Sequence, residues 1–137
     1  MLKLFLSFIL LLPVFLNATE IEVDKNVKNI PSALQKRVIS YWEKRAQKQF
    51  EETYEYELPY LQYLHTSLWY EQFFQDAPKF SKIIVKKVEN INKNKSIIGL
   101  LLYPKYNSKN FVFLYDTWVK IDGNWYHKYK DSSLPGS

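Results

Sequence analysis

The chain of 137 residues contains no cysteine, three glycines and two histidines. Without cysteine it can form no disulfide and no thiolate metal site, and it has no lipid-modified N-terminal cysteine. The glycines, at positions 99, 123 and 136, form neither a phosphate-binding loop nor a Gly-x-Ser-x-Gly elbow. His65 and His127 stand without a spaced carboxylate cluster, so no metal site is predicted. We therefore expect no cofactor and no bound metal, and nothing supports nucleotide-dependent or nucleophilic chemistry.

Residues 1–18 have the pattern of a secretory signal peptide. Lys3 precedes an apolar run from Leu4 to Leu16, and the small residue Ala18 follows it. The run is shorter than the ~20 residues that a membrane-spanning helix needs, and no second hydrophobic segment follows. Cleavage near Ala18 is therefore predicted. It implies a periplasmic or secreted location, with no transmembrane anchor after processing.

The charge of the chain is mildly positive. Its formal net charge of +5 includes the one charge of Lys3, which is lost with the signal peptide. We interpret most of the lysines as solvated surface residues, with attraction to anionic cell-wall polymer or lipid headgroups as the alternative. Export and the absence of a binding motif argue against nucleic acid as a partner.

A helical block is predicted for the first half of the exported chain. From Pro31 onward, apolar residues recur at three- and four-residue spacing as far as Tyr54, which predicts one long helix with Ser32 as N-cap and Pro59 as its end. Short helices are predicted over residues 60–64 and 67–75, the second capped by Thr66 or Ser67. Residues 19–30 are either a flexible lead-in or a short added strand.

The second half of the chain is predicted to be β-structure. Four strands are expected over residues 80–91, 96–103, 111–121 and 124–130. Asp122–Gly123, between the last two strands, is typical of a tight hairpin turn. A meander of strands behind a helical block predicts an α+β domain, with helices on one face of an antiparallel sheet of about four strands.

Two stretches of the sequence give the chain a resemblance to the NTF2-like superfamily. Trp118-Val-Lys-Ile-Asp-Gly-Asn-Trp125 ends the sheet, and Tyr54-Glu-Tyr-Glu-Leu-Pro-Tyr60 is similar to the helix-to-sheet transition of secreted bacterial members of unassigned function. The resemblance covers residues 31–131, which leaves residues 132–137 as a flexible tail. It implies a cone in which a curved sheet wraps around the long helix and leaves a pocket at its mouth. A cystatin-like fold is the alternative architecture.

Asp116 is a charged residue in the middle of an apolar strand face, where it needs a partner. If Asp122–Gly123 forms a two-residue turn, Asp116 falls opposite Tyr129 and beside His127, as a pocket carboxylate. If the turn has three residues, Asp116 falls opposite Lys128 and forms a cross-strand ion pair on the surface. The resemblance implies that enzymatic relatives place such an aspartate, often with a histidine or tyrosine, inside the pocket.

Histidine and aromatic residues complete the set of site candidates. His65 lies between two short helices, where it either points into the pocket or caps a helix, and His127 is interpreted as a surface strand residue. Aromatic residues are dense in the helical block, and a subset at the pocket mouth would stack on sugars or hold a peptide. The candidate ligand-binding residues are Tyr60, Tyr63, His65, Tyr70, Asp116 and Trp118. If the protein is an enzyme, the candidate catalytic residues are Asp116 and His65.

Three functions are considered on this basis. The first is an exported, non-catalytic NTF2-like binding domain for a small ligand or a protein, such as a cell-wall fragment or a small apolar molecule. The second is a cofactor-independent isomerase, dehydratase or cyclase that uses Asp116 in the pocket. The third is a structural or dimerisation module. Residues 97–102 and 111–114 are apolar on both strand faces, which points to a homodimer through the outer face of the sheet.

Overall fold

The structure is a computed structural model that describes residues 18–107 and 109–129. Residues 1–17 of the predicted signal peptide and the predicted C-terminal tail, residues 132–137, lie outside these residues. In chain order the elements are β1 (Glu20–Val23), α1 (Ser32–Ala46), α2 (Phe50–Tyr54), α3 (Pro59–Leu64), α4 (Ser67–Phe74), β2 (Phe80–Asn92), β3 (Lys95–Pro104), β4 (Val112–Ile121) and β5 (Asn124–Lys128).

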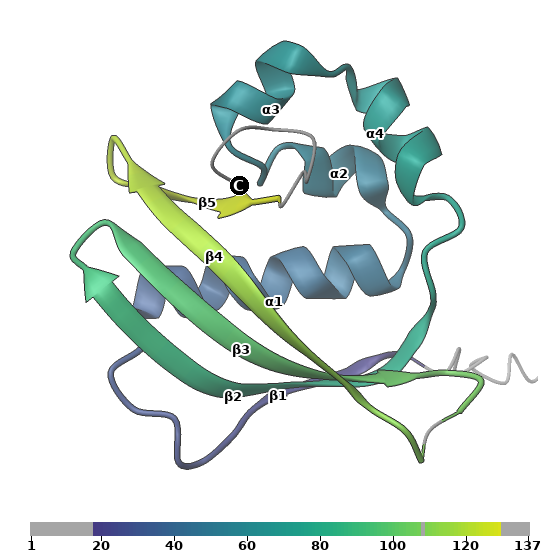
Figure 1. The fold of residues 1–137 in the computed structure, drawn as a ribbon, viewed down its shortest axis with the longest axis vertical. Helices are drawn as coiled ribbons and strands as arrows, with labels where there is room; N and C mark the ends of the chain where they lie inside the picture. Colours follow the sequence, from purple (N-terminus) through teal and green to yellow (C-terminus); the bar gives the residue numbers. More distant parts are fainter. Residues whose placement is uncertain (1–17, 108, 130–137) are drawn as a thin grey trace, which may run out of the picture.

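The strands form a single curled sheet in the order β1-β2-β3-β4-β5 (Figure 1). β2 to β5 are an antiparallel meander, as predicted, whereas β1 pairs in parallel with the edge of β2. The sheet therefore has five strands and is mixed, where four antiparallel strands were expected. Residues 19–30 are polar with scattered aliphatic residues, a pattern that does not distinguish a flexible lead-in from the short strand β1. Ile21 and Val23 of this strand pack on the core, which fixes its register.

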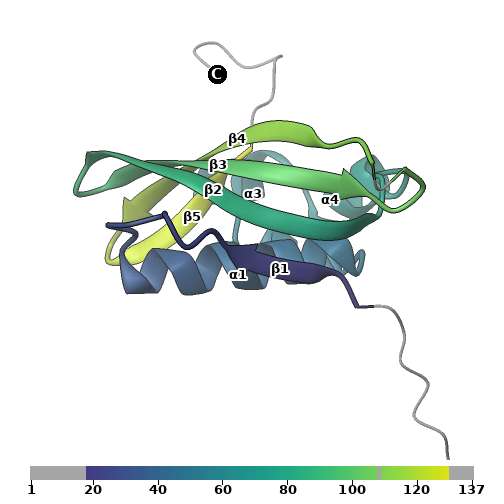
Figure 2. The ribbon, with the colours of Figure 1, turned by 90° about the horizontal axis from the view of Figure 1, so that it is seen from below.

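Helix α1 lies along the inner face of the sheet and contacts both edge strands, β1 and β5 (Figure 2). Its buried side chains repeat at helical spacing and meet the inward-facing residues of β2 to β5. The core between helix and sheet consists of Leu34, Val38, Tyr41, Trp42, Ala46, Phe80, Ile83, Val85, Ile98, Leu100, Leu102, Trp118 and Trp125. This layer arrangement confirms the α+β class.

The predicted long helix is interrupted after Ala46. Lys48 has a left-handed backbone with φ of 58°. Its N–H donates to the carbonyl of Arg45, and the N–H of Gln49 donates to the carbonyl of Lys44. These are the two hydrogen bonds of a Schellman C-cap, which usually has glycine at the left-handed position. Because lysine occupies that position, no local residue signal marks the end of the helix. Ser32 is the first helical residue, and its predicted role as N-cap is wrong because the cap residue is Pro31.

The remaining helices form a second, smaller cluster beside β5 (Figure 1). Phe50, Leu61, Tyr70 and Phe74 are buried in it, and Tyr129 packs against them from the end of the last strand. The predicted cap of α4 is confirmed, because the Thr66 hydroxyl accepts a hydrogen bond from the Trp69 N–H. The turn at Lys48, between α1 and α2, reverses the chain so that this cluster packs beside the sheet.

The β4–β5 hairpin has the two-residue turn. Ile121 pairs with Asn124, and Asp122 and Gly123 have φ angles of 49° and 83°. Positive φ at both central residues defines a type I′ turn. Thr117 is then the partner of Lys128, so the three-residue alternative, in which Lys128 faces Asp116, is wrong.

The outer face of the sheet has no helix over it in Figure 2. Phe113 and Tyr115 of β4 point to this face and are 43% and 49% exposed. Their rings contact each other, with centroids 4.8 Å apart.

Across residues 18–107 and 109–129, no helix is long and apolar enough to cross a membrane.

Candidate functional site

The site begins with a backbone contact between the helical block and the last strand. Glu57 forms an isolated parallel bridge with His127. The His127 N–H donates to the carbonyl of Tyr56, and its carbonyl accepts from the Leu58 N–H. Pro59 favours the extended backbone that Leu58 needs for this pairing. The bridge brings the side chains of Glu57 and His127 together.

His127 lies between two carboxylates. Its Nδ1 is 2.7 Å from Oε2 of Glu57, and its Nε2 is 2.9 Å from Oδ1 of Asp116. The histidine and Asp116 are each 5% exposed, and Glu57 is fully buried. The interpretation of His127 as a surface residue is therefore wrong. The face of β5 that it shares with Trp125 is the inner one.

Each carboxylate is also held by hydrogen bonds from neutral donors. Oδ2 of Asp116 accepts from Nε1 of Trp42 at 2.8 Å. Oε1 of Glu57 accepts from the hydroxyls of Tyr41 and Tyr70, at 2.8 and 2.7 Å. All four carboxylate oxygens thus have at least one partner, which is what burial of two acids requires.

Arg45 joins this network through Tyr41. Its Nη1 donates to the Tyr41 hydroxyl at 2.6 Å, and its guanidinium lies over the ring of Phe74 at 4.0 Å from the centroid. Arg45 and a protonated His127 together balance the charges of Glu57 and Asp116. The cluster therefore holds four charges with no net charge.

The surroundings set the proton affinities of the cluster. Burial alone would lower the pKa of His127, but the two neighbouring carboxylates raise it from 6.5 to about 10. The imidazole is therefore protonated at neutral pH and donates from both nitrogens. Burial raises the pKa of Tyr41 and Tyr70 above the usual range, and the charge of Glu57 adds to the effect, so both hydroxyls remain donors. For Arg45, burial opposes the charge, but the charge of Glu57 and the hydrogen bond to Tyr41 hold its pKa above the usual range.

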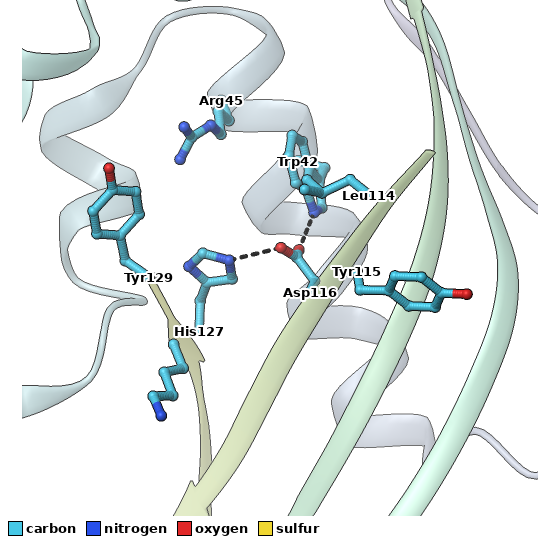
Figure 3. Close-up of a pocket in the computed structure, with 8 residues that line it drawn as sticks. Trp42, Arg45, Leu114, Tyr115, Asp116, His127 and Tyr129 are labelled. Carbon is cyan, nitrogen blue, oxygen red and sulfur yellow. Dashed lines mark hydrogen bonds and ion pairs between the residues drawn. The ribbon is translucent and has the colours of Figure 1, made fainter. Parts of the chain in front are cut away.

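A pocket of about 240 Å³ opens beside the cluster (Figure 3). Asp116 and His127 form its polar wall, and Arg45 faces them across it from the last turn of α1. Figure 3 shows the Tyr115 ring pointing away from these groups, so the strand backbone supplies that part of the lining. The residues that line the pocket are Trp42, Arg45, Leu114, Tyr115, Asp116, His127, Lys128 and Tyr129.

The wall of the pocket is poorly suited to proton transfer. A general base must have a lone pair that can take a proton from the substrate. Both nitrogens of His127 are engaged with carboxylates, and each oxygen of Asp116 already accepts a hydrogen bond. No group of three or more potential ligand side chains that could hold a metal occurs in the described part of the chain. The arrangement can orient a ligand more readily than it can exchange protons with one.

The residues predicted for the site are dispersed in the structure. Asp116 lines the pocket, but His65 does not, and its ring stacks on Trp69 at a centroid distance of 3.6 Å. Tyr60 and Tyr63 lie on α3 and are 57% and 88% exposed.

Two further residues of the predicted set belong to the core. Tyr70 is fully buried and donates to Glu57, and Trp118 is fully buried beside His127. Nε1 of Trp118 is the one buried polar side-chain atom without a hydrogen-bond partner in residues 18–107 and 109–129. Its ring packs edge-on against Tyr41. Neither residue lines the pocket.

Five residues of the cluster were absent from the predicted site: Tyr41, Trp42, Arg45, Glu57 and His127. Tyr41 and Arg45 are four residues apart on α1, so they share a helix face with a guanidinium within reach of a hydroxyl. Glu57 precedes Leu58–Pro59, and no local pattern shows that this short extended segment pairs with a strand 70 residues later. The alternation of Trp125 and His127 was the available signal that His127 faces inward.

Comparisons with known proteins show a likeness of fold. The chain matches no family model and no curated protein. Among solved structures it is similar to the solution structure of a SEC-C motif containing protein from Rhodopseudomonas palustris, with a TM-score of 0.53 and 14% sequence identity. The match covers 68% of this chain and 73% of that protein. At this identity the likeness concerns the fold alone.

Proposed function

We propose that this chain is an exported, non-catalytic binding domain of the NTF2-like type that holds a small ligand in the pocket beside Asp116. One observation carries the proposal: an open pocket adjoins a buried network whose acids and imidazole already have partners. Such a network fixes the shape of one wall. The curled sheet around α1, with the pocket beside the last hairpin, is the arrangement expected of an NTF2-like cone.

The catalytic alternative has one supporting observation, which is that Asp116 and His127 both line the pocket. To act as a base, Asp116 would have to exchange its bond to Trp42 or to His127 for one to a substrate. Each exchange leaves a buried donor without a partner, which costs about 1–3 kcal/mol. Binding without turnover avoids this cost.

A fragment screen by NMR tests the proposal. The ¹⁵N-labelled protein is titrated with a library of small fragments, and the indole N–H of Trp42 reports on the pocket because it donates to Asp116. We expect hits that shift this signal. Leu114→Trp should block them by filling the pocket, whereas Leu64→Trp, at an exposed leucine of α3, should leave them unchanged.

The same hits separate binding from catalysis. Each is incubated with the protein and examined by mass spectrometry. Recovery of unchanged compound is expected. A converted product that a folded Asp116→Asn variant no longer forms would establish the enzyme alternative instead. A screen in which no fragment moves the Trp42 signal in a folded protein would remove the small-ligand function.

Export is part of the proposal and has its own test. It rests on the pattern from Lys3 to Ala18, and mass spectrometry of the exported protein should find an N-terminus near residue 19. A mature species that retains Met1 would contradict it.

The dimerisation function is favoured by the contact between Phe113 and Tyr115, two exposed aromatic residues on the outer face of the sheet. Light scattering at micromolar concentration measures the mass. A dimer that Phe113→Ser converts to a monomer would support this function, and a monomeric mass for the unmodified protein would remove it.

A further inference from the structure

The hydrogen bonds of Arg45 leave part of its guanidinium without a partner. The group has five N–H donors. Within residues 18–107 and 109–129 its one hydrogen bond is to the Tyr41 hydroxyl, and no carboxylate there forms an ion pair with it. Phe74 covers one face of the guanidinium plane. The N–H groups along its remaining edge therefore need an acceptor, either water or a ligand.

The acids of the cluster cannot readily supply that acceptor. Glu57 is held by two tyrosines and His127, and Asp116 is held by Trp42 and His127. To bind Arg45 directly, either acid would have to leave a buried donor unpaired. The guanidinium is thus kept charged and fixed in place by Tyr41 and Phe74, but it is not neutralised by direct contact.

Apart from Asp116, His127 and Lys128, the side chains that line the pocket around Arg45 are apolar or aromatic. Leu114, the ring of Trp42 and Tyr129 form the wall around Arg45 (Figure 3). A volume of about 240 Å³ corresponds to roughly eight water molecules at ~30 Å³ each. A ligand that fits has a short apolar or aromatic body and one polar end.

We propose that the ligand is a small organic monocarboxylate, with its carboxylate bound to the free edge of Arg45 and its apolar body between Leu114, Trp42 and Tyr129. This inference rests on the proposed binding function and names its ligand class. A planar carboxylate matches the fork of a guanidinium and accepts two parallel hydrogen bonds. Because the four charges of the cluster already cancel, one added negative charge is better tolerated than two. A carboxylate is therefore preferred over phosphate.

Matched carboxylates and amides test this class. Phenylacetate, 3-phenylpropionate, their primary amides and inorganic phosphate are titrated into the ¹⁵N-labelled protein, with the Trp42 indole signal as readout. Trp42→Phe assigns that signal among the four tryptophans. We expect at least one carboxylate to bind about tenfold or more tightly than its amide, as for a charge-assisted hydrogen bond, and phosphate to leave the signal unmoved.

Variants then locate the effect. Arg45→Gln should reduce the preference for carboxylate over amide to within about threefold, and Arg45→Lys, which keeps the charge but not the fork, should retain only part of it. Lys120→Gln is the control for net charge, because Lys120 is on the same hairpin but does not line the pocket. It should leave the preference intact. If Arg45→Gln does not fold, the comparison of carboxylate with amide in the unmodified protein still decides the matter.

The outcomes distinguish the two proposals. If amides bind the pocket as tightly as carboxylates, or if phosphate binds it, the carboxylate inference is wrong while the binding function stands. If the fragment screen finds neutral ligands and no carboxylate of the set binds, the same conclusion follows. If neither the set nor the screen moves the Trp42 signal, both proposals fail.

Discussion

His127 and Glu57 are joined twice, although 70 residues separate them in the sequence: by a backbone bridge and by a side-chain contact of 2.7 Å between Nδ1 and Oε2. The bridge fixes the segment before α3 to β5. The side chains then connect that segment, through Asp116, to β4. The polar cluster thereby joins the helical block to the end of the sheet, and the pocket lies beside this junction.

The first prediction concerns pH. Because the carboxylates raise the pKa of His127 to about 10, above its usual 6.5, the folded protein holds this proton more tightly than the unfolded chain. The stabilisation is complete below about pH 6.5 and is lost as the pH rises to about 10. We therefore expect the free energy of unfolding to fall across this range, by on the order of a few kcal/mol. Urea denaturation at pH 6.5, 8 and 9.5 measures it.

His65 provides the control for this experiment, because it is the other of the two histidines. In His65→Asn the only imidazole is that of His127, so the pH dependence should persist and the NMR titration of the ring is assigned without ambiguity. An imidazole that titrates near 6.5 would contradict the buried charge cluster.

The second prediction is that Glu57→Gln strongly destabilises the fold. Glutamine retains one acceptor oxygen but presents an NH₂ group where a carboxylate oxygen accepts from His127 or from the two tyrosines. Loss of a charge partner in a buried pair costs about 3–5 kcal/mol. Glu55→Gln is the matched control on an exposed neighbour, and it should stay within about 0.5 kcal/mol of the unmodified protein. Equal effects of the two substitutions in urea denaturation would remove the structural role of Glu57.

The third prediction tests whether Asp116 pairs with His127, as in the structure, or with Lys128, as a three-residue turn would require. A surface pair with Lys128 would contribute at most about 1 kcal/mol. The buried pair with His127 predicts that Asp116→Asn costs about 3 kcal/mol or more and lowers the pKa of His127. Both are measured on one sample, by denaturation and by imidazole titration. A mutant that loses less than about 1 kcal/mol with an unchanged His127 titration would argue against the pair.

The sequence predicted the hairpin and the order of the strands because their signals are local. Asp122–Gly123 marked the hairpin but left a two-residue and a three-residue turn open. The register in the structure decides between them and places Asp116 beside His127. The pairing of Glu57 with His127 could not be predicted in the same way. This partner is distant in sequence, and no local pattern distinguishes the buried Glu57 from the exposed Glu55 two residues earlier. The end of α1 was missed for a third reason, which is that lysine occupies a position where glycine is the usual signal.

The last prediction tests that helix end directly. Lys48 pays a conformational cost of about 1 kcal/mol or more for its left-handed backbone, which glycine does not. The lysine ammonium donates to the carbonyl of Gln75, but that contact is exposed and contributes little. Glycine also makes the unfolded chain more flexible, which offsets part of the gain. We expect Lys48→Gly to raise the free energy of unfolding by about 0.5–1 kcal/mol.

Lys48→Ala is the control, because it removes the same ammonium contact but keeps the Cβ and its conformational cost. It should be neutral or slightly destabilising. Which of the two variants, Lys48→Gly or Lys48→Ala, is more stable depends on the backbone conformation at this position. If the helix ran unbroken to Tyr54, as the apolar spacing predicted, glycine would lie in a helix interior and would be about 1 kcal/mol less stable than alanine. At a Schellman turn the glycine variant is instead more stable than the alanine variant. Urea denaturation of the two variants under the same conditions therefore decides whether the chain turns at Lys48, and with it whether α2 and Glu57 are carried back to His127.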